Sequence, residues 1–480
     1  MGKELKRYGI TLAVLYAVYA VVSYLIFLRD DFLLERIAFL TDSPGFLEKG
    51  RELAKLLHVN SIPTLLYFLT VTAMFVVYAK ALRLLRNQSS GQSTSSKIVL
   101  RYAAAFLITT FLSFPALSTD VFDYIASNRV LFVHHANPWI EPPQNFPQDP
   151  FIYLGSWKFR ASVYGPVQFL TSSLIHVFAK DDLLMNVIGF KFMGGIFTLA
   201  TIVLLKKWFQ KYSPDNFLYG LALFAWNPLI HIEIVGNAHN DMVMAFFSLL
   251  GFYWFFEGRL MIAAAALALA VLAKVVAILF VPIFGWWLFL QGKRRDAVRF
   301  LSWFSLMTLG GFLSLGEGLR GFIGNLGVQL ELYLRSFPTA VRFMFLKMGF
   351  EKGQAVWAEK LVTIPPFLLL LTGALSRIRR TGVIAGMVVI ILLYLVLVSP
   401  MLQPWYLAWI LPFAAILPRG RLQAVVLLSS YTSLLYYAVL FASFYLYPLN
   451  FFWQIAMLAT IALPPLILGV IPQRWYTERQ

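Results

Sequence analysis

The sequence has no cysteine among its 480 residues, and it is poor in charged side chains. Without thiols, no disulfide bond can hold an outer loop and no cysteine can act as a nucleophile. Charged residues make up 13% of the chain and apolar residues 59%, against roughly 25% and 45–50% in ordinary soluble domains. This composition excludes a soluble globular protein and predicts an integral membrane protein.

Apolar runs of about membrane-spanning length recur along the whole chain. A transmembrane helix needs about 17–25 mostly apolar residues. The predicted runs lie at 8–28, 61–82, 99–117, 162–179, 184–205, 217–235, 241–257, 260–290, 297–315, 361–376, 383–398, 404–418, 422–446 and 450–471. They predict an all-α fold, a polytopic transmembrane helix bundle of about 13 spans. The first run is too long for a signal peptide and no small-residue cleavage site follows it, so we expect it to form the first span.

Acidic residues are few, 23 against 40 lysines and arginines, which gives the chain a net charge of +17. The basic residues cluster between apolar runs, as the positive-inside rule predicts, so membrane orientation explains them without nucleic-acid binding. Their alternation predicts a multi-pass protein of the cell membrane, with residues 118–161 and 317–360 outside. We therefore expect one integral membrane domain, 1–480, with a catalytic transmembrane module at 99–316 and C-terminal helices at 361–480.

The most polar stretch, Ser118–Pro166, directly follows an apolar run. Ionisable residues beside a membrane helix indicate a functional site by default. Asp120 and Asp123 open a segment with helical periodicity, in which Asp120 and Tyr124 share a face. Asp120 has two interpretations, a helix N-cap or a general base that takes a proton from an acceptor hydroxyl. Both stay open, since a capping residue can also act as a base.

Turn motifs and two histidines follow in the same stretch. Asn137-Pro138-Trp139 and Tyr164-Gly165-Pro166 are typical of turns. His134 and His135 could donate to a phosphate or ligate a metal. No spacing of histidines and carboxylates here makes a convincing metal site. The sequence therefore predicts no cofactor, with a divalent metal as an unsupported alternative.

A second polar cluster, Asn237, His239, Asn240 and Asp241, lies between two apolar runs. Four polar side chains in five positions exceed what helix packing needs, which favours a functional site over interhelical hydrogen bonding. Charge alone does not fix the topology of residues 162–240. We expect the turn to face the outer cavity beneath the 118–166 loop, because polar non-helical backbone at membrane depth is tolerated only where it lines a cavity.

Lys274 lies far from either end of an apolar run. A lysine in such a position costs about 2.5–3.5 kcal/mol on insertion scales. It can pair with a carboxylate for structural reasons or bind an anionic phosphate. The same alternatives apply to Arg129, for which solvation in an outer loop is the simpler explanation.

Several segments together resemble bacterial polytopic glycosyltransferases of the GT-C superfamily, above all the polyprenyl-phosphate-mannose-dependent α-mannosyltransferases. The segments are TDVFDYIASNRVLFVHHANPW, YGP at a helix start, WNPLIHIEIVGNAHND, LAKVVAILFVPI and QPWYLAWILPF. The resemblance implies a GT-C bundle with long extracytoplasmic loops and an extracytoplasmic active site. It also implies inverting transfer of a hexose, with mannose favoured, from a polyprenyl-phosphate donor to a lipid or glycan acceptor, with Asp120 as the base.

The expected site residues follow from these segments. The expected catalytic residues are acidic: Asp120, Asp123 and Asp241. The expected substrate-binding residues are polar, cationic or aromatic: Tyr124, Arg129, His134, His135, Asn137, Trp139, Tyr164, Asn237, His239, Asn240, Lys274, Gln403 and Tyr406. A cation or hydrogen-bond donor among them would stabilise the leaving phosphate. The expected partners are the sugar donor, the acceptor and membrane lipids, with no nucleic acid, and the sequence does not give the oligomeric state.

Two other functions stay open. A transporter or flippase for a lipid-linked glycan is the rival from a different class, and it predicts two repeated halves with broken helices at the bilayer midplane. The sequence shows no such repeat, which favours the enzyme. The other alternative is a GT-C enzyme with a protein or arabinan acceptor. The sequence does not name the sugar, the acceptor or the linkage.

Overall fold

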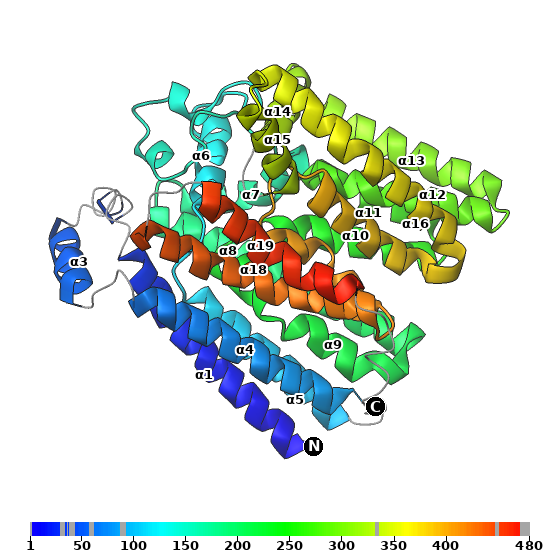
Figure 1. Cartoon of the computed structure of the whole chain (residues 1–480), viewed down its shortest axis with the longest axis horizontal. Helices are drawn as coiled ribbons and strands as arrows, with labels where there is room; N and C mark the ends of the chain where they lie inside the picture. The colour runs from blue at the N-terminus through cyan, green and yellow to red at the C-terminus, as the bar shows by residue number, and fades with distance from the viewer. Residues whose placement is uncertain are drawn as a thin grey trace. The chain divides into compact units, whose positions relative to one another are not determined.

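The computed structural model describes residues 2–28, 34–35, 37, 44–56, 62–86, 93–331, 336–446 and 451–470. Every regular element in these residues is a helix, and none of the described residues forms a β-strand. This confirms the predicted all-α class (Figure 1). The chain forms two compact units, Met1–Gln329 and Leu330–Gln480.

The first unit contains most of the predicted site. Its α-helices are α1 (Gly2–Phe27), α3 (Pro44–Leu56), α4 (Ile62–Leu85), α5 (Ser93–Phe111), α6 (Asp120–Phe132), α7 (Pro166–Ala179), α8 (Leu183–Tyr212), α9 (Phe217–Ala225), α10 (Asp241–Phe256), α11 (Leu260–Ala273), α12 (Val281–Leu290), α13 (Arg294–Leu313) and α14 (Gly318–Glu331), the last of which ends just past the boundary. Short 3₁₀ or π segments are η1 (Pro143–Asn145), η2 (Pro150–Tyr153), η3 (Pro214–Asn216), η4 (Ile230–Gly236) and η5 (Val275–Phe280).

The second unit consists of α15 (Phe337–Lys347), α16 (Lys352–Leu397), η6 (Pro404–Trp409), α17 (Leu411–Ile416), α18 (Arg421–Leu446) and α19 (Phe451–Val470). The described part of 317–360, predicted as a long outer connection, is therefore largely helical. A buried ion pair between Arg342 and Glu359, 2.6 Å apart, holds α15 against α16. Helix α16 is kinked at Gly382, which has φ 81° and ψ 162°.

Five helices among the described residues are long and apolar enough to cross a membrane. They are α1, α4, α8, α16 and the first 22 residues of α18. Two bent pairs, α9 with η4 and α13 with α14, raise the number to seven if each pair is one span. Several shorter apolar helices, including α7, α10 and α11, lie between them. The figure of about 13 spans stays a prediction.

In the first unit, two of the predicted continuous runs are broken, at Lys274 and after α9. The run 260–290 stops at Lys274, which is extended (φ −150°, ψ 116°) between α11 and η5. The run 217–235 turns after α9, because Pro228 has no N–H to continue the helix and Asn227 Oδ1 accepts the Leu229 N–H at 3.0 Å. Hydropathy alone does not reveal such breaks, since the flanking residues are apolar on both sides.

Lys191 of α8 fixes the path of the chain into α6. Its ammonium donates to the carbonyl oxygens of Phe111, at 2.9 Å, and of Ser113. These carbonyls follow the end of α5, where helix carbonyls lack intrahelical partners and a cation is favourable. The side chain of Lys191 therefore orients the segment that leads to Asp120.

Candidate active site

Asp120 is the first residue of α6 and lies in a polar cluster. The N-cap of α6 is Thr119, whose side chain makes no capping hydrogen bond, so Asp120 does not cap the helix. The Asp120 N–H donates to Ser118 Oγ at 3.2 Å. The Asp120 side chain is 17% exposed, and the helix dipole favours a carboxylate at this end. Its carboxylate remains available for chemistry.

The environment makes Asp120 a stronger base than an ordinary aspartate. Burial raises the pKa of the Asp120 carboxyl to about 6, although the positive charge of Lys274 opposes the shift. A general base works best when its pKa lies near the working pH. Asp120 is therefore ionised at neutral pH and still basic enough to accept a proton.

His239 lies between Asp120 and a second carboxylate, that of Glu233. Its Nδ1 is 3.7 Å from Asp120 Oδ2, and its Nε2 is 3.4 Å from Glu233 Oε2. Tyr124 Oη lies 3.5 Å from the same Nδ1. The side chains of His239 and Glu233 are fully buried. A chain of ionisable groups thus runs from the partly exposed Asp120 into the interior.

The backbone that carries Glu233 and His239 is irregular. Glu233 belongs to η4, a π-helical segment, and such segments are frequent at functional sites. Ala238 has a φ of +59°, a left-handed conformation that is uncommon for a residue with a side chain. Unusual backbone of this kind persists where the surroundings hold it in place and clusters at active sites.

Asn237 provides one of the contacts that hold this turn. Its Oδ1 accepts the Leu117 N–H at 3.0 Å and its Nδ2 donates to the Ile232 carbonyl at 2.9 Å. The turn is thereby joined to the segment that leads into Asp120, 120 residues away in sequence. Asn240 is also buried, and its Oδ1 has no hydrogen-bond partner among the described residues.

Asp241 and Lys274 form an ion pair beside the same cluster. Lys274 Nζ lies 2.5 Å from Asp241 Oδ1. The Asp241 side chain is fully buried and that of Lys274 is 19% exposed. Each charge complements a helix dipole, because Asp241 begins α10 and Lys274 follows the end of α11. The Lys274 ammonium also lies 5.8 Å from the centre of the Tyr164 ring.

Two glycines hold the main chain next to Lys274. The Gly165 N–H donates to the Ala273 carbonyl at 3.4 Å, and a Cβ at Gly165 would overlap the Leu272 carbonyl oxygen. A Cβ at Gly311 would overlap the side chain of Leu272. Only glycine allows the approach at 165, whereas a larger residue at 311 would have to displace the Leu272 side chain. The Tyr164-Gly165-Pro166 turn thus places the Tyr164 ring near the Lys274 ammonium.

Asp123 lies one turn further along α6 and contacts the backbone of the loop. Its carboxylate accepts the N–H of Ser156 at 3.2 Å and of Trp157 at 2.8 Å. Burial, together with the negative charge of Asp120, raises the pKa of Asp123 to about 8, and the two N–H donors oppose this shift. Asp123 thus ties the 155–157 segment to α6 close to Asp120.

Arg129 and His134 belong to a separate cluster at the other end of α6. Arg129 lies 2.6 Å from both Asp149 and Asp181, and His134 Nε2 lies 2.8 Å from Asp149. Nine residues of helix put Arg129 about 13 Å along the axis from Asp120. His135 is exposed and has a φ of +50°. This cluster orders the loop that follows α6 and lies away from Asp120.

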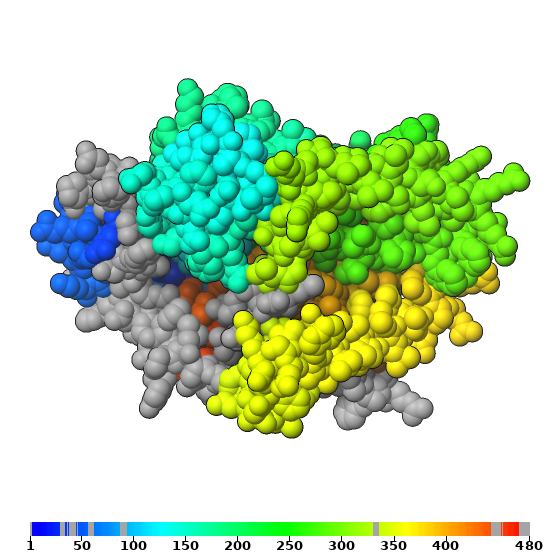
Figure 2. Space-filling view, turned by 90° about the horizontal axis from the view of Figure 1, so that it is seen from above, coloured from blue at the N-terminus to red at the C-terminus, as the bar shows by residue number. Residues whose placement is uncertain are grey.

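Asn137 and Trp139 form a corner that packs on α14. Asn137 Oδ1 accepts the Trp139 N–H at 3.0 Å, and the Trp139 indole N–H donates to the Tyr164 carbonyl at 2.8 Å. Asn325 Nδ2 donates to the Trp139 carbonyl at 2.9 Å. Figure 2 shows the segment after α6, in cyan, beside the yellow-green α14. The hydrogen bond from Trp139 thus helps to hold Tyr164 in position near Lys274.

Gln403 and Tyr406 lie in the second unit. Gln403 is buried and precedes η6. The Tyr406 ring stacks on Trp409, with centroids 4.4 Å apart. These contacts hold the short turn between α16 and α17.

The structure thus brings together residues from four predicted segments: Asp120 and Tyr124, Tyr164, His239 and Asp241, and Lys274. Glu233 was not among the predicted site residues, although a carboxylate inside an apolar run was a signal for it. Asp149 and Asp181, the partners of Arg129, do not lie inside apolar runs, so nothing in the sequence marked them as partners of Arg129. Among the described residues, no three histidine or acidic side chains are arranged to hold a metal ion.

Comparison with known proteins identifies relatives over much of the chain. Residues 37–290, more than half of the sequence, match the family model described as "Alpha-(1->6)-mannopyranosyltransferase, N-terminal domain". The matched range contains every residue of the Asp120 cluster.

Individual relatives are distant. An Alpha-(1->6)-mannopyranosyltransferase A from Mycobacterium tuberculosis is 23% identical over 342 residues, which cover 66% of this chain and 64% of the relative. Proteins A and B of the same description from Corynebacterium glutamicum are 23% and 22% identical, over 39% and 44% of this chain and 38% and 35% of their own lengths. The alignments therefore span between about a third and two thirds of these relatives. From the match over residues 37–290, the chain belongs to the alpha-(1->6)-mannopyranosyltransferase family.

Proposed function

We propose that this protein is a membrane glycosyltransferase that transfers mannose from a polyprenyl-phosphate donor to a glycan or glycolipid acceptor. Membership of the mannopyranosyltransferase family supports the sugar and the reaction class. The apolar helices support a membrane location and a lipid-borne donor. The reaction takes place at Asp120, on the extracytoplasmic face.

One observation carries the proposal more than any other. Asp120 is a partly exposed carboxylate that faces His239 and, through it, Glu233, while Lys274 contributes a positive charge to the same site. The transfer of a sugar from a phosphate donor needs a base for the acceptor proton and a cation for the leaving phosphate, and this cluster contains both.

The reaction is a single displacement. The acceptor hydroxyl oxygen forms a bond to the anomeric carbon of mannose, and the bond between that carbon and the phosphate oxygen breaks. The hydroxyl proton passes to the Asp120 carboxylate, and the electron pair of the broken bond leaves with the polyprenyl phosphate. Attack on the face opposite the phosphate inverts the configuration at the anomeric carbon.

His239 and Glu233 position and support the base. With its Nε2 proton directed to Glu233, the imidazole presents the Nδ1 lone pair to Asp120. Burial and the positive charge of Lys274 lower the pKa of His239, so the imidazole stays neutral and accepts a hydrogen bond from Asp120 once that carboxyl is protonated. Asp120 then returns to its ionised form by releasing its proton to water at its exposed edge. The 3.7 Å separation in the unliganded site fits the observation that catalytic hydrogen bonds often tighten only with substrate bound.

Lys274 supports the leaving group. The departing phosphate gains negative charge, and a cation in a water-poor site stabilises that charge strongly. The Lys274 ammonium has three donors, and Asp241 takes one of them at 2.5 Å. The Tyr164 ring beside it offers an apolar face on which a sugar can stack.

The test is sugar transfer by the purified, reconstituted protein. Wild type is supplied with polyprenyl-phosphate mannose or with a nucleotide-activated mannose, and radiolabelled glycolipid products are separated. We expect transfer from the polyprenyl donor alone. For Asp120→Asn we expect a 10²–10⁴-fold loss of kcat, the usual contribution of a positioned base.

Two results would contradict the proposal. Transfer from the nucleotide sugar, with none from the lipid donor, would show the donor class to be wrong. Near-normal turnover by Asp120→Asn would remove Asp120 from the role of base, even if the donor class held.

A further inference from the structure

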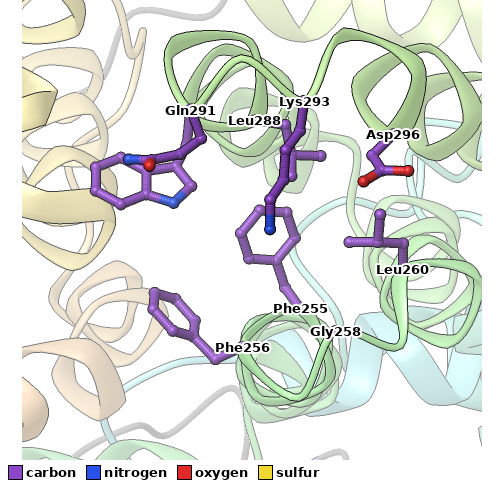
Figure 3. Close-up of a pocket in the computed structure, with 9 residues that line it drawn as sticks. Phe255, Phe256, Gly258, Leu260, Leu288, Gln291, Lys293 and Asp296 are labelled. Carbon is purple, nitrogen blue, oxygen red and sulfur yellow. The ribbon is translucent and has the colours of Figure 1, made fainter.

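A cavity lies in the first unit, at the end of the α10–α11 hairpin away from Asp120. Its volume is about 230 Å³. It lies between the turn that joins α10 to α11 and the turn that joins α12 to α13 (Figure 3). Nothing in the proposed reaction uses it.

The distance from the reaction site follows from the helices themselves. Helix α10 begins at Asp241, in the reaction site, and ends at Phe256, which lines the cavity. Helix α11 returns from Leu260, also in the wall, to Lys274. A helix of 16 residues is about 24 Å long. The two sites therefore lie at opposite ends of one helical hairpin.

The cavity has polar as well as apolar walls, and the side chain of one exposed cation, Lys293, points into it. Phe255, Phe256 and Trp287 contribute aromatic rings to its lining. Figure 3 shows the Lys293 side chain extending from the α12–α13 turn toward Phe255, with its nitrogen inside the cavity. Gln291 adds an amide to the lining. The site thus offers donors for an anion and a hydrophobic surface next to them.

One carboxylate, Asp296, belongs to the cavity lining itself, and both it and Glu257 beside the cavity face other cations. Asp296 lies 3.8 Å from Arg299, one turn along α13. Glu257 accepts from Lys211 and from Tyr212, each at 2.6 Å. Within the part of the chain that the structure describes, no acidic side chain forms an ion pair with Lys293.

The surroundings are basic and aromatic, as at the headgroup level of a membrane. Arg294 and Arg295 follow Lys293 and are exposed. Trp286 and Phe289 are 38% and 42% exposed. Aromatic rings together with lysine and arginine mark the membrane interface, and basic pockets between membrane helices bind anionic lipid headgroups.

We propose that this cavity binds the phosphate headgroup of an anionic phospholipid. Lys293 and Gln291 donate to the phosphate oxygens, and the acyl chains lie along the exposed Trp286 and Phe289. A neutral phospholipid also carries a phosphate, but its choline ammonium would come close to Lys293, Arg294 and Arg295. Charge therefore selects the anionic lipid.

The test measures lipid retention by native mass spectrometry. The full-length protein is exchanged from mixed micelles that contain equal amounts of phosphatidylglycerol and phosphatidylcholine. We expect wild type to retain phosphatidylglycerol, and Lys293→Ala to retain roughly tenfold less, as the loss of a hydrogen bond to a charged phosphate predicts. Arg295→Ala is the matched control, because it removes the same charge from the same end of α13 without touching the cavity lining.

Further arms of the experiment distinguish a lipid held in the cavity from one attracted by surface charge. Leu260→Trp fills the cavity while keeping every charge and should lower retention as Lys293→Ala does. Glycerol phosphate in solution should not displace the lipid, because it lacks the acyl chains. Mannosyl transfer by each variant in neutral vesicles should match wild type, which shows that the variants are folded.

Three results would overturn the inference. These are equal retention of both lipids by wild type, equal losses in Lys293→Ala and Arg295→Ala, and displacement of the lipid by glycerol phosphate at the concentration of the lipid. Since retention is measured without a sugar donor, a failure here is distinct from a failure of the proposed transferase activity.

Discussion

Lys274 Nζ lies 2.5 Å from Asp241 Oδ1 and joins the open ends of the α10–α11 hairpin. One partner follows the end of α11 and the other begins α10. The pair therefore closes the hairpin and holds a cation near Asp120, where the proposed reaction needs one. These two effects can be separated by substitution.

Removing either partner alone should destabilise the protein. Lys274→Met leaves Asp241 as an uncompensated buried charge, and Asp241→Leu does the same to Lys274. Breaking a buried pair in this way costs about 3–5 kcal/mol. We expect lower thermal midpoints for both variants in detergent, with most of the loss recovered in the double variant. The double variant should remain inactive, because it lacks the cation; recovery of transfer would show that Lys274 has only a structural role.

The activity should depend on pH through Asp120. Because burial raises its pKa to about 6, the carboxylate is protonated below that pH and cannot accept the hydroxyl proton. The rate should therefore fall about tenfold per pH unit below 6 and be level above it. A profile of kcat against pH measures this directly.

Lys274 should set the position of that profile. Its positive charge favours ionised Asp120 and lowers the pKa, so its removal should raise the pKa and move the acid limb of the profile to higher pH. Any residual activity of Lys274→Met provides the measurement. Lys180→Met, which removes an exposed lysine at the end of α7, serves as control and should leave the profile in place.

Glu233→Gln should lower kcat and leave the fold intact. The amide keeps the shape of the side chain but binds the Nε2 proton of His239 less strongly than a carboxylate does, so the imidazole is less firmly held in the orientation that faces Asp120. We expect a loss of about 10–100-fold, smaller than for Asp120→Asn because Glu233 acts through His239. Slow turnover with a normal thermal midpoint would support this role. A lower thermal midpoint, with normal kcat in the folded fraction, would assign Glu233 to structure alone.

Gly165→Ala should damage the site although it adds only one methyl group. The new Cβ would overlap the Leu272 carbonyl oxygen, so the turn and Tyr164 must move away from Lys274. We expect a lower thermal midpoint and reduced transfer. Gly195→Ala in α8 is the control, because a Cβ there meets nothing within 4 Å; it should stabilise the helix by about 0.5–1 kcal/mol. Equal behaviour of the two variants would refute the close approach.

Much of the architecture follows from hydropathy. The apolar runs predicted helices of membrane-spanning length, and α1, α4 and α8 lie where the runs place them. The break at Lys274 was not predictable, because residues 260–290 are apolar on every face and only one charged residue marks the end of α11. The helices within 317–360 were missed for the opposite reason, since α14 and α15 mix polar and apolar residues and lack a long apolar run.

The site was predictable to the extent that polar residues are rare in this chain. Asp120, His239, Asp241 and Lys274 stood out because each is costly beside apolar neighbours. The distances between these residues depend on the geometry of turns, such as the one with the left-handed Ala238. Amino-acid composition does not encode that geometry. Roles for these residues beyond their placement stay predictions.

The two glycines on either side of Leu272 have an evolutionary consequence. A Cβ at Gly165 would overlap the main chain of Leu272, and a Cβ at Gly311 would overlap its side chain. The sizes of the residues at these three positions are therefore coupled. A larger residue at 165 has no room in any background, whereas a larger residue at 311 could be accepted if position 272 became smaller. An alignment of relatives should therefore show an invariant glycine at 165. Positions 272 and 311 should change together, so that the packing that places Lys274 is preserved.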